Sequence, residues 1–387
     1  MMEHKTLSIK LSVIYIAIYG ALACIYPFLI YYFQAKGLSY TEMGITFATI
    51  SMTGVIVQPI WGFITDKYSN KRRIIIITML FSALLVYSLI LANSFYWIIV
   101  SIILLMSSQS PVVPIADAYC YEIIEQYKKL QYGKIRLMGS FGYAVVALLM
   151  GYIIKKTGIN TSYIIYSILM FLGVLSLFSI DYIGKATRKN VTFDDVVKLI
   201  RYKKFILLIV TVILTNISNG SNSSYIPVLI EKTGGDVTQL GMVWFIIAIS
   251  ELPAFYFSAK LIGKYGELNL YILGVALFAL RYFLDSLCDD YIPVLVIQMM
   301  QGVTYTFYLI TSLQYVNKIS PAKMRTSAIT LHAAAMGVGG AIGNIGGGLL
   351  LEYISIFMLY QILALICVIC LYILVLLKRV DYNESFN

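Results

Sequence analysis

The sequence GFITDKYSNKRR, Gly62 to Arg73, is a short basic loop between two long apolar segments. The run from Met43 to Thr65 leads into it without a charged residue, and the equally uncharged run from Ile74 to Ile99 follows it. Each run can cross a bilayer, because roughly 20 apolar residues at about 1.5 Å per residue span the hydrocarbon core. Four cations lie in the loop, and short loops rich in Lys and Arg stay in the cytoplasm. The loop therefore predicts a protein that crosses the membrane several times.

The composition of the whole chain points the same way. The 387 residues are 60% hydrophobic and 12% charged, with a mean hydropathy of +0.83, which excludes a soluble domain. The net charge of +10 is explained by Lys and Arg in predicted cytoplasmic loops, so we expect no nucleic-acid partner. Cys367 and Cys370 lie in an apolar run and read as small hydrophobic residues rather than a redox pair. Leu11 to Phe33 is too long for the apolar region of a signal peptide and lacks a small-residue cleavage site, so it reads as the first span.

Twelve apolar runs predict twelve transmembrane helices. They lie at residues 11–33, 43–65, 74–92, 96–118, 136–155, 161–182, 205–229, 239–259, 268–287, 291–314, 326–350 and 355–377. Only helices are admissible, because an open strand in lipid would leave backbone donors and acceptors unsatisfied. An even number of spans places both termini in the cytoplasm of a cell-membrane protein, in agreement with Lys5 and Lys10 at one end and Lys378 and Arg379 at the other.

A long polar connection divides the chain into two halves. We expect an N-terminal six-helix bundle at 1–182, a cytoplasmic linker with a short interfacial helix at 183–204, and a C-terminal six-helix bundle at 205–387. A shift of 197 residues lays Gly44 on Gly241, in the second span of each half, as a parallel duplication requires. The predicted fold class is an all-α membrane protein of two pseudo-symmetric bundles.

Charges inside the predicted spans are candidate functional groups, because each costs about 2.5–3.5 kcal/mol to insert. Asp117 and Glu251 have no cation at helical spacing, so each needs a partner from another helix or from a ligand. Arg281 and Asp285 lie four residues apart on one helical face, where they can form a structural ion pair or take part in coupling. A carboxyl group in such a place can exchange protons near neutral pH, and Glu251 is the first candidate for a proton carrier.

Polar side chains gather in the seventh and tenth spans. TNISNGSNSSY contains Asn219 and Asn222, which suit a polar cavity for an uncharged, hydroxyl-rich ligand, with hydrogen bonds between helices as the equal alternative. Gln301 and Tyr305 belong to a polar stripe in the tenth span. The candidate substrate-binding residues are Asp117, Arg136, Tyr143, Asn219, Asn222, Glu251, Gln301 and Tyr305, and the candidate coupling residues are Glu251, Arg281 and Asp285.

Enzyme chemistry is not indicated. Gly339, Gly343 and Gly347 repeat every four residues in the eleventh span, which is typical of close helix packing rather than of a nucleotide loop. No zinc pattern or catalytic triad appears, and the two histidines are His4 and His332. We therefore expect no enzyme, no metal and no cofactor, with a proton gradient as the energy source.

GFITDKYSNKRR is similar to the signature loop between the second and third helices of the major facilitator superfamily, with Ser69 where glycine is common. The chain also looks like the lactose permease and phenylpropionate permease branch of that superfamily. The segments that carry this likeness are IYPFLIYYFQAKGLSYTEMGITFATIS, QPIWG, ADAY, YGKIRLMGSFGYA, ISEL and LGVALFALR. The resemblance implies proton symport of a small organic solute (a sugar, nucleoside or aromatic acid) by two bundles that rock about a central site. A facilitator, an exporter or a non-transporting sensor is the alternative.

The resemblance also implies roles for single residues. Asp117, Arg136 and Tyr143 resemble the acidic, basic and aromatic residues that hold sugar in that branch. Glu251 resembles its eighth-helix glutamate, and Arg281 resembles the ninth-helix arginine used in coupling.

Some positions depart from the pattern of the branch. Asn219 and Asn222 fall near positions that are acidic in lactose permease. In the tenth span, Gln301 and Thr304 stand where the branch has a His and a Glu for coupling, so a lactose-like coupling route is not expected.

The basic loop is predicted to act as a gate. Its gating motif comprises Gly62, Asp66, Lys67, Lys71, Arg72 and Arg73. Asp66 is expected to lie against the positive end of the eleventh helix, near Pro321 to Arg325, and to hold the cytoplasmic side shut; capping of its own loop is the alternative. We expect a monomer whose partners are a small-molecule substrate and the lipid bilayer.

Overall fold

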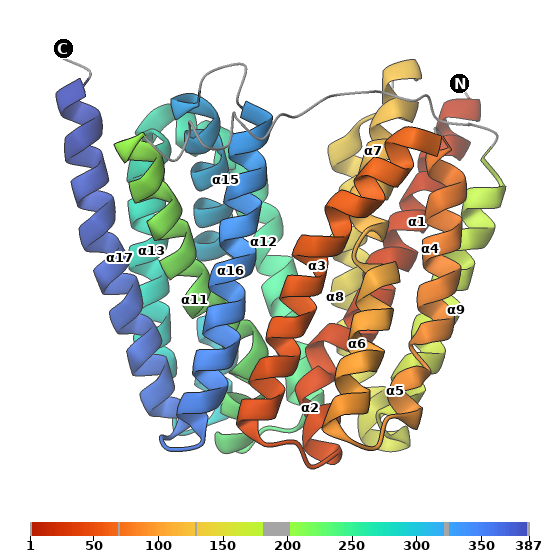
Figure 1. Ribbon diagram of the computed structural model, residues 1–387, viewed down its shortest axis with the longest axis horizontal. Coiled ribbons are helices and arrows are strands. Elements are labelled where there is room, and N and C mark those ends of the chain that lie inside the picture. The colour runs from red at the N-terminus through yellow and green to blue at the C-terminus, as the bar shows by residue number, and fades with distance from the viewer. Residues whose placement is uncertain (1, 69, 128–129, 181–201, 321–324, 385–387) are drawn as a thin grey trace. The chain divides into compact units, whose positions relative to one another are not determined.

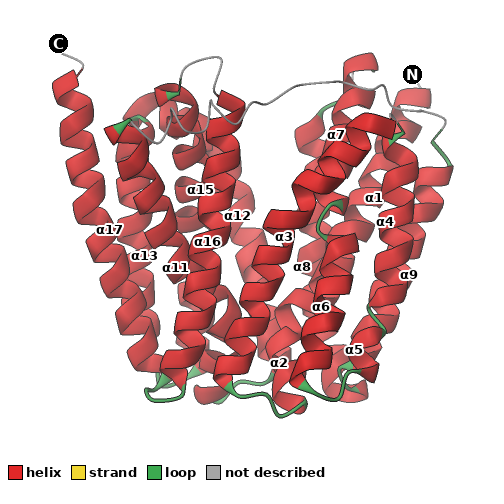
Figure 2. Ribbon diagram, viewed as in Figure 1, coloured by secondary structure: helices red, strands yellow, loops and turns green. Residues whose placement is uncertain are grey.

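The computed structural model describes residues 2–68, 70–127, 130–180, 202–320 and 325–384. These residues form helices without any strand (Figure 2). In chain order (Figure 1), the elements are α1 (Met2–Ile25), η1 (Tyr26–Phe28), α2 (Leu29–Ala35), α3 (Tyr40–Tyr68), α4 (Lys71–Leu85), α5 (Ser88–Leu91), α6 (Phe95–Gln109), α7 (Val112–Gln126), α8 (Tyr132–Thr157), α9 (Asn160–Phe178), α11 (Lys203–Lys232), α12 (Val237–Tyr265), α13 (Glu267–Asp285), α14 (Tyr291–Gln298), α15 (Gln301–Ile319), α16 (Arg325–Leu351) and α17 (Ile356–Glu384).

Twelve stretches of the described residues are long and apolar enough to cross a membrane, so the predicted all-α fold with twelve spans is confirmed. The predicted limits differ most in the fourth and eighth spans, and the eighth continues to Tyr265 rather than residue 259. The fourth continues to Gln126, beyond the predicted residue 118, because α7 remains helical past its apolar part. The predicted end of the sixth span, residue 182, lies outside the described residues.

Prolines interrupt two of the spans. Pro27, which lacks an N–H, lies in the 3₁₀ turn η1, and Pro111 separates α6 from α7. The hydroxyl group of Tyr26 donates to Gln109 Oε1 at 2.8 Å, so the two interruptions lie against each other. Irregular backbone is tolerated at membrane depth where protein surrounds it in this way.

The chain forms two compact units. Unit 1 comprises Met1–Leu38, Met52–Arg188 and Asp236–Ala248, and unit 2 comprises Ser39–Ser51, Lys189–Gly235 and Ile249–Asn387. Two helices are divided between the units. The beginning of α12 belongs to unit 1 and its remainder to unit 2, whereas the beginning of α3 belongs to unit 2 and its remainder to unit 1. The predicted boundaries at 182 and 205 stay a prediction, and most of the linker 183–204 lies outside the described residues.

Close helix packing in both units depends on glycine. In unit 1, α1 packs against α8, where a Cβ on Gly142 would lie 2.9 Å from the backbone of Ile16. In unit 2, α11 packs against α16, where a Cβ on Gly339 would lie 2.5 Å from the carbonyl oxygen of Ile213. The predicted use of the α16 glycines for helix packing is therefore confirmed.

The start of α3 packs against α16 in unit 2. A Cβ on Gly44 would lie 2.5 Å from the carbonyl oxygen of Asn344, and one on Gly348 would collide with the carbonyl oxygen of Tyr40. A side chain at either glycine would therefore force the two helices apart.

The start of α12 packs against α8 in unit 1 through the equivalent positions. A Cβ on Gly241 would lie 2.7 Å from the carbonyl oxygen of Ala147, and one on Gly151 would lie 2.7 Å from that of Val237. All four positions are related to those of the α3–α16 contact by the same offset of 197 residues. The internal repeat suggested by Gly44 and Gly241 thus extends to the packing of the helices.

Candidate functional site

The carboxylate of Asp117 lies among tyrosines in unit 1. It projects from α7 and accepts a hydrogen bond of 2.6 Å from the hydroxyl group of Tyr15, a buried residue of α1. The ring of Tyr15 also meets the edge of Tyr132 at 6.4 Å, and Tyr132 stacks on Tyr121 at 4.2 Å between centroids. Asp117 is half-buried. The carboxylate therefore keeps acceptor capacity for a polar ligand in a largely aromatic environment.

Arg136 lies next to this cluster on α8. Its guanidinium lies 3.9 Å from the ring centroid of Tyr19, within the range of a cation–π interaction. Tyr19 is one turn from Tyr15 on α1, and the two rings stack at 6.4 Å with an interplanar angle of 10°. The two tyrosines thus hold an acceptor group, Asp117, and a donor group, Arg136, close together. No ion pair joins these two groups within the described part of the chain.

Tyr143, the third residue predicted for unit 1, lies on α8 and packs edge-on against Trp244 of α12, with centroids 6.3 Å apart. The indole nitrogen of Trp244 is buried and has no hydrogen-bond partner among the described residues. Buried donors normally have partners, so this one is free to bind a ligand or water. Sequence reasoning missed Trp244, and also Tyr15 and Tyr19.

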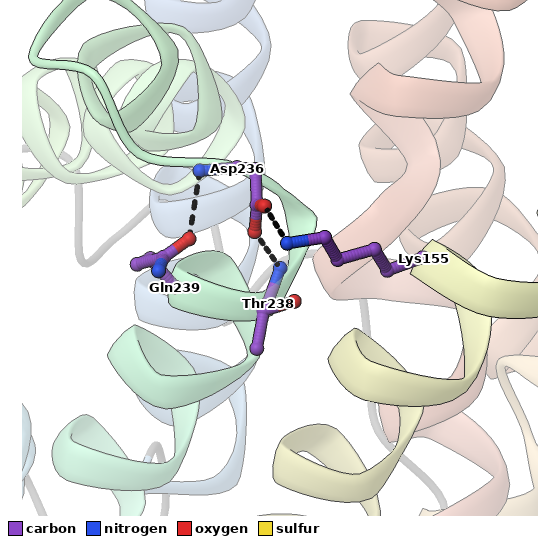
Figure 3. A network of polar contacts seen from close by, with 4 residues as sticks. All are labelled: Lys155, Asp236, Thr238 and Gln239. Carbon is purple, nitrogen blue, oxygen red and sulfur yellow. Dashed lines mark hydrogen bonds and ion pairs between the residues drawn. The ribbon is translucent and has the colours of Figure 1, made fainter.

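A polar network fixes the start of α12 to the end of α8 (Figure 3). Lys155 Nζ lies 2.6 Å from Asp236 Oδ2, and the other carboxylate oxygen accepts from the Thr238 N–H at 2.7 Å. The Asp236 N–H donates to Gln239 Oε1 at 2.9 Å, which completes a capping box at the helix start. Burial alone raises the pKa of Asp236, but the hydrogen bonds from Lys155 and Thr238 outweigh it and hold that pKa below its usual range.

Unit 2 has the equivalent arrangement at the start of α3. The Ser39 N–H donates to Glu42 Oε2 at 2.9 Å, and the Glu42 N–H donates to Ser39 Oγ at 3.2 Å. The Thr41 N–H donates to Glu352 Oε1, which lies beyond the end of α16, at 2.9 Å. Glu352 occupies the position that Lys155 has in the other copy, 197 residues away. Both helices therefore begin with a capping box that is tied to the end of a neighbouring helix.

The charged residues of α13 form a buried network in unit 2. Arg281 and Asp285 are both fully buried, yet within the described residues they do not form the direct ion pair that their spacing suggested. The amide of Gln298 on α14 lies between them: Arg281 donates to its Oε1 at 3.1 Å, and its Nε2 donates to the Asp285 oxygens at 3.2 and 3.1 Å. The guanidinium also lies 4.8 Å from the centroid of the Tyr282 ring. The expected pair is thus an amide-bridged pair.

Glu251 lies where α12 meets α15 in unit 2. The Gly302 N–H donates to Ser250 Oγ at 3.1 Å, and a Cβ on Gly302 would lie 2.8 Å from the backbone nitrogen of Glu251. Gln301 directly precedes this contact, and its Oε1 is buried without a hydrogen-bond partner among the described residues. The structure therefore brings Glu251 and Gln301, two predicted site residues, onto adjoining helix segments.

The asparagines of α11 divide into two kinds. Asn222 Oδ1 accepts from the Tyr360 hydroxyl group at 2.9 Å, which is the hydrogen bonding between helices that was the alternative to a ligand site. Asn219 Oδ1, in contrast, is buried and has no partner among the described residues. Tyr305 packs its ring 6.4 Å from that of Tyr308. Asn219 is therefore the stronger candidate for a polar ligand.

The basic loop is described only in part. Gly62 is exposed, Lys71 is buried and forms an ion pair with Glu122 of α7, and Arg72 donates to the carbonyl oxygen of Ile180 at 2.5 Å. The side chains of Asp66 and Lys67 lie outside the described parts, as do residues 321–324. The contact between Asp66 and the eleventh helix stays a prediction.

Known proteins resemble this chain over most of its length. The model of the MFS_1 like family matches residues 8–362. The maltose permease of Geobacillus stearothermophilus is 25% identical over 367 residues, which cover 94% of this chain and 93% of that protein. The putative nucleoside transporter YegT of Escherichia coli is 24% identical over 343 residues, which cover 82% and 78%.

A solved structure shares the fold. The crystal structure of the nucleoside transporter NupG has a TM-score of 0.85 at 16% identity and covers 96% of this chain and 99% of that one. Permeases among the relatives confirm the predicted resemblance to the lactose permease and phenylpropionate permease branch. The chain therefore belongs to the MFS_1 like family and is a multi-pass membrane transporter of the major facilitator superfamily, not an enzyme.

Proposed function

We propose that the protein carries a sugar or a nucleoside across the cell membrane by proton symport with alternating access. The observation that carries this proposal is the position of Asp117 and Arg136 against the stacked rings of Tyr15 and Tyr19, where Asp117 accepts from Tyr15 and Arg136 lies over Tyr19. A carboxylate accepts hydrogen bonds from hydroxyl groups, a guanidinium donates to ring and carbonyl oxygens, and aromatic faces pack against flat rings. Sugars and nucleosides offer both hydroxyl groups and rings, and the names of the relatives support the same two classes.

Buried polar groups of unit 2 extend the proposed substrate contacts. Asn219 Oδ1 and Gln301 Oε1 are acceptors without described partners, and buried acceptors are normally satisfied. Hydroxyl groups of a solute would satisfy them. Gln301 directly precedes the α12–α15 contact next to Glu251, and Asn219 lies on α11, which packs against α15 in the same unit.

Proton coupling is assigned to Glu251, with Arg281 and Asp285 in support. Glu251 is half-buried in a transmembrane helix, where a carboxyl group is costly unless it has a role. Arg281 and Asp285 are a buried charge pair whose bridging amide can rearrange when either charge changes. No cofactor is proposed, and the proton gradient is the energy source. We propose that both termini lie in the cytoplasm, which the basic loops of the sequence support.

The α8–α12 and α3–α16 contacts are the proposed moving parts. Each is a backbone-to-backbone contact through glycine that can separate without unfolding either helix. Their relation by the 197-residue repeat supports two equivalent gates of one alternating-access cycle.

Uptake into proteoliposomes tests this function. A panel of sugars, nucleosides and aromatic acids is offered with and without a pH gradient. We expect one class to accumulate only when the lumen is more alkaline than the medium, and a protonophore should abolish accumulation. Saturable flux that does not depend on the gradient would establish a facilitator instead. A facilitator is the second candidate because Gln301 and Thr304 carry no titratable group. The absence of saturable flux for every class would refute transport of these solutes.

A further inference from the structure

A cavity of about 440 Å³ lies between the start of α4 and the end of α9 in unit 1. It is lined by Asn70, Arg72, Arg73, Ile76, Ile77 and Phe178. Two of these residues are cations, three are apolar, and no carboxylate is among them. The cavity is separate from the Asp117 cluster, and none of the groups assigned to solute binding lines it.

The two arginines have donors to spare. Arg72 uses one nitrogen on the carbonyl oxygen of Ile180, at the end of α9. The side chain of Arg73 is exposed and makes no hydrogen bond or ion pair with the described residues. Guanidinium groups bind phosphate through two parallel hydrogen bonds. A cavity whose described lining holds two arginines and no carboxylate therefore suits a phosphate group.

The apolar part of the cavity continues as two exposed stripes. On α4 and α9, exposed apolar residues follow the cavity at intervals of three or four, on one face of each helix: Ile77, Phe81 and Leu84 on α4, and Phe178, Leu175 and Phe171 on α9. The two helices pack side by side (Figure 1), with Ser167 Oγ donating to the Ala83 carbonyl oxygen at 2.8 Å. The stripes therefore form one lipid-facing surface that begins at the arginines.

The membrane limits place the arginines at headgroup level. The third span begins at Lys71 and the sixth ends at Phe178, so the cavity lies at the boundary of both. Basic pockets between helices at such a boundary bind the headgroups of anionic lipids. We propose that this cavity binds the phosphate group of an anionic phospholipid through Arg72 and Arg73, with the acyl chains along the exposed faces of α4 and α9. Free phosphate offers the same anionic oxygens but has nothing to occupy the apolar surface.

Native mass spectrometry of the full chain in detergent tests this site. Phosphatidylglycerol, phosphatidylcholine or inorganic phosphate is added at equal concentration, and bound copies are counted. We expect one copy of phosphatidylglycerol to be retained. Arg73→Gln should weaken its binding about fivefold, the loss expected for one cation at an anionic surface, and Arg72→Gln with Arg73→Gln should abolish it. Arg73→Lys should restore part of the binding.

A matched control removes two cations from the end of another exposed helix. Lys378→Gln with Arg379→Gln, at the end of α17, should leave the retained copy unchanged. Because the Arg73 side chain makes no hydrogen bond or ion pair with the described residues, Arg73→Gln alone decides the matter if the double variant does not fold. Equal retention of phosphatidylcholine, full competition by inorganic phosphate, or unchanged binding in Arg73→Gln would overturn the proposal.

Discussion

The cost of breaking the buried Arg281 network can be worked out from its contacts. Arg281 is fully buried, its charge is balanced by Asp285, and the Gln298 amide connects the two. Asp285→Asn removes the balancing charge and turns a charge-assisted hydrogen bond into a neutral one. Removing one partner of a buried pair costs about 3–5 kcal/mol, of which a hydrogen bond to a charged group accounts for about 1.5–3 kcal/mol. We expect Asp285→Asn to lower the free energy of unfolding by about 3 kcal/mol.

A double-mutant cycle separates this coupling from other effects. Arg281→Met should be about as costly as Asp285→Asn, because it leaves a buried carboxylate without its cation. The combined variant should cost about 2 kcal/mol less than the sum, since neither charge then remains buried alone. Unfolding in detergent micelles, followed by tryptophan fluorescence, measures these free energies. Asp289→Asn, an exposed carboxylate beyond the same helix, is the control and should stay within about 0.5 kcal/mol of the wild type.

Additive costs, equal to the sum of the single variants within about 0.5 kcal/mol, would refute the coupling through Gln298. A transport assay of the same variants then separates a structural role of the Arg281–Asp285 pair from a role in coupling. A combined variant that is as stable as either single variant but cannot accumulate solute supports a role in coupling. One that accumulates solute normally assigns the pair to structure alone.

Three other contacts yield predictions that can be measured separately. Gly241→Leu should weaken the α8–α12 contact by about 1–3 kcal/mol through overpacking, so amide hydrogen exchange at the start of α12 should rise. Tyr19→Leu should weaken solute binding about 2- to 30-fold by removing the ring beneath Arg136, whereas Tyr19→Phe should not; equal effects would contradict the cation–π contact. The lowered pKa of Asp236 means that its ion pair with Lys155 contributes stability above the ordinary value of 3.8 and loses it only at lower pH. Asp236→Asn should therefore change transport by the same factor at pH 5 and pH 8, and a factor that varies between them would count against the assignment.

The membrane fold was predictable because the signal is long and simple. Each span needs about 20 apolar residues, and interruptions such as Pro27 and Pro111 do not hide a run of that length. The repeat was also within reach of the sequence, since Gly44 and Gly241 lie 197 residues apart in equivalent spans. Gly151 and Gly348 complete the same contacts, but only the packing of the helices shows this.

The partners in the site were much harder to predict. Asp117 and Arg136 stand out because charge in an apolar span is costly. Tyr15 and Tyr19 do not, because the chain has 32 tyrosines and most positions in a tyrosine-rich helix look alike. Trp244 was marked only by its position 197 residues after Phe47, which is another aromatic residue in the equivalent span.

The Arg281 network shows the limit of helical spacing as evidence. Residues four apart share a face, so a direct pair between Arg281 and Asp285 was a sound expectation. Spacing does not reveal what another helix inserts between them. The amide of Gln298 comes from α14, and only the packing of that helix against α13 shows it.

Solute counterflow measures the central claim most directly, because it requires binding and exchange across the membrane but no net movement of protons. Once the solute is identified, we expect Asp117→Asn to abolish both counterflow and accumulation, and Glu251→Gln to retain counterflow while losing proton-driven accumulation. Normal counterflow in Asp117→Asn would contradict the assignment of the tyrosine-flanked carboxylate to solute binding. Undiminished proton-driven accumulation in Glu251→Gln would contradict the assignment of the proton to Glu251.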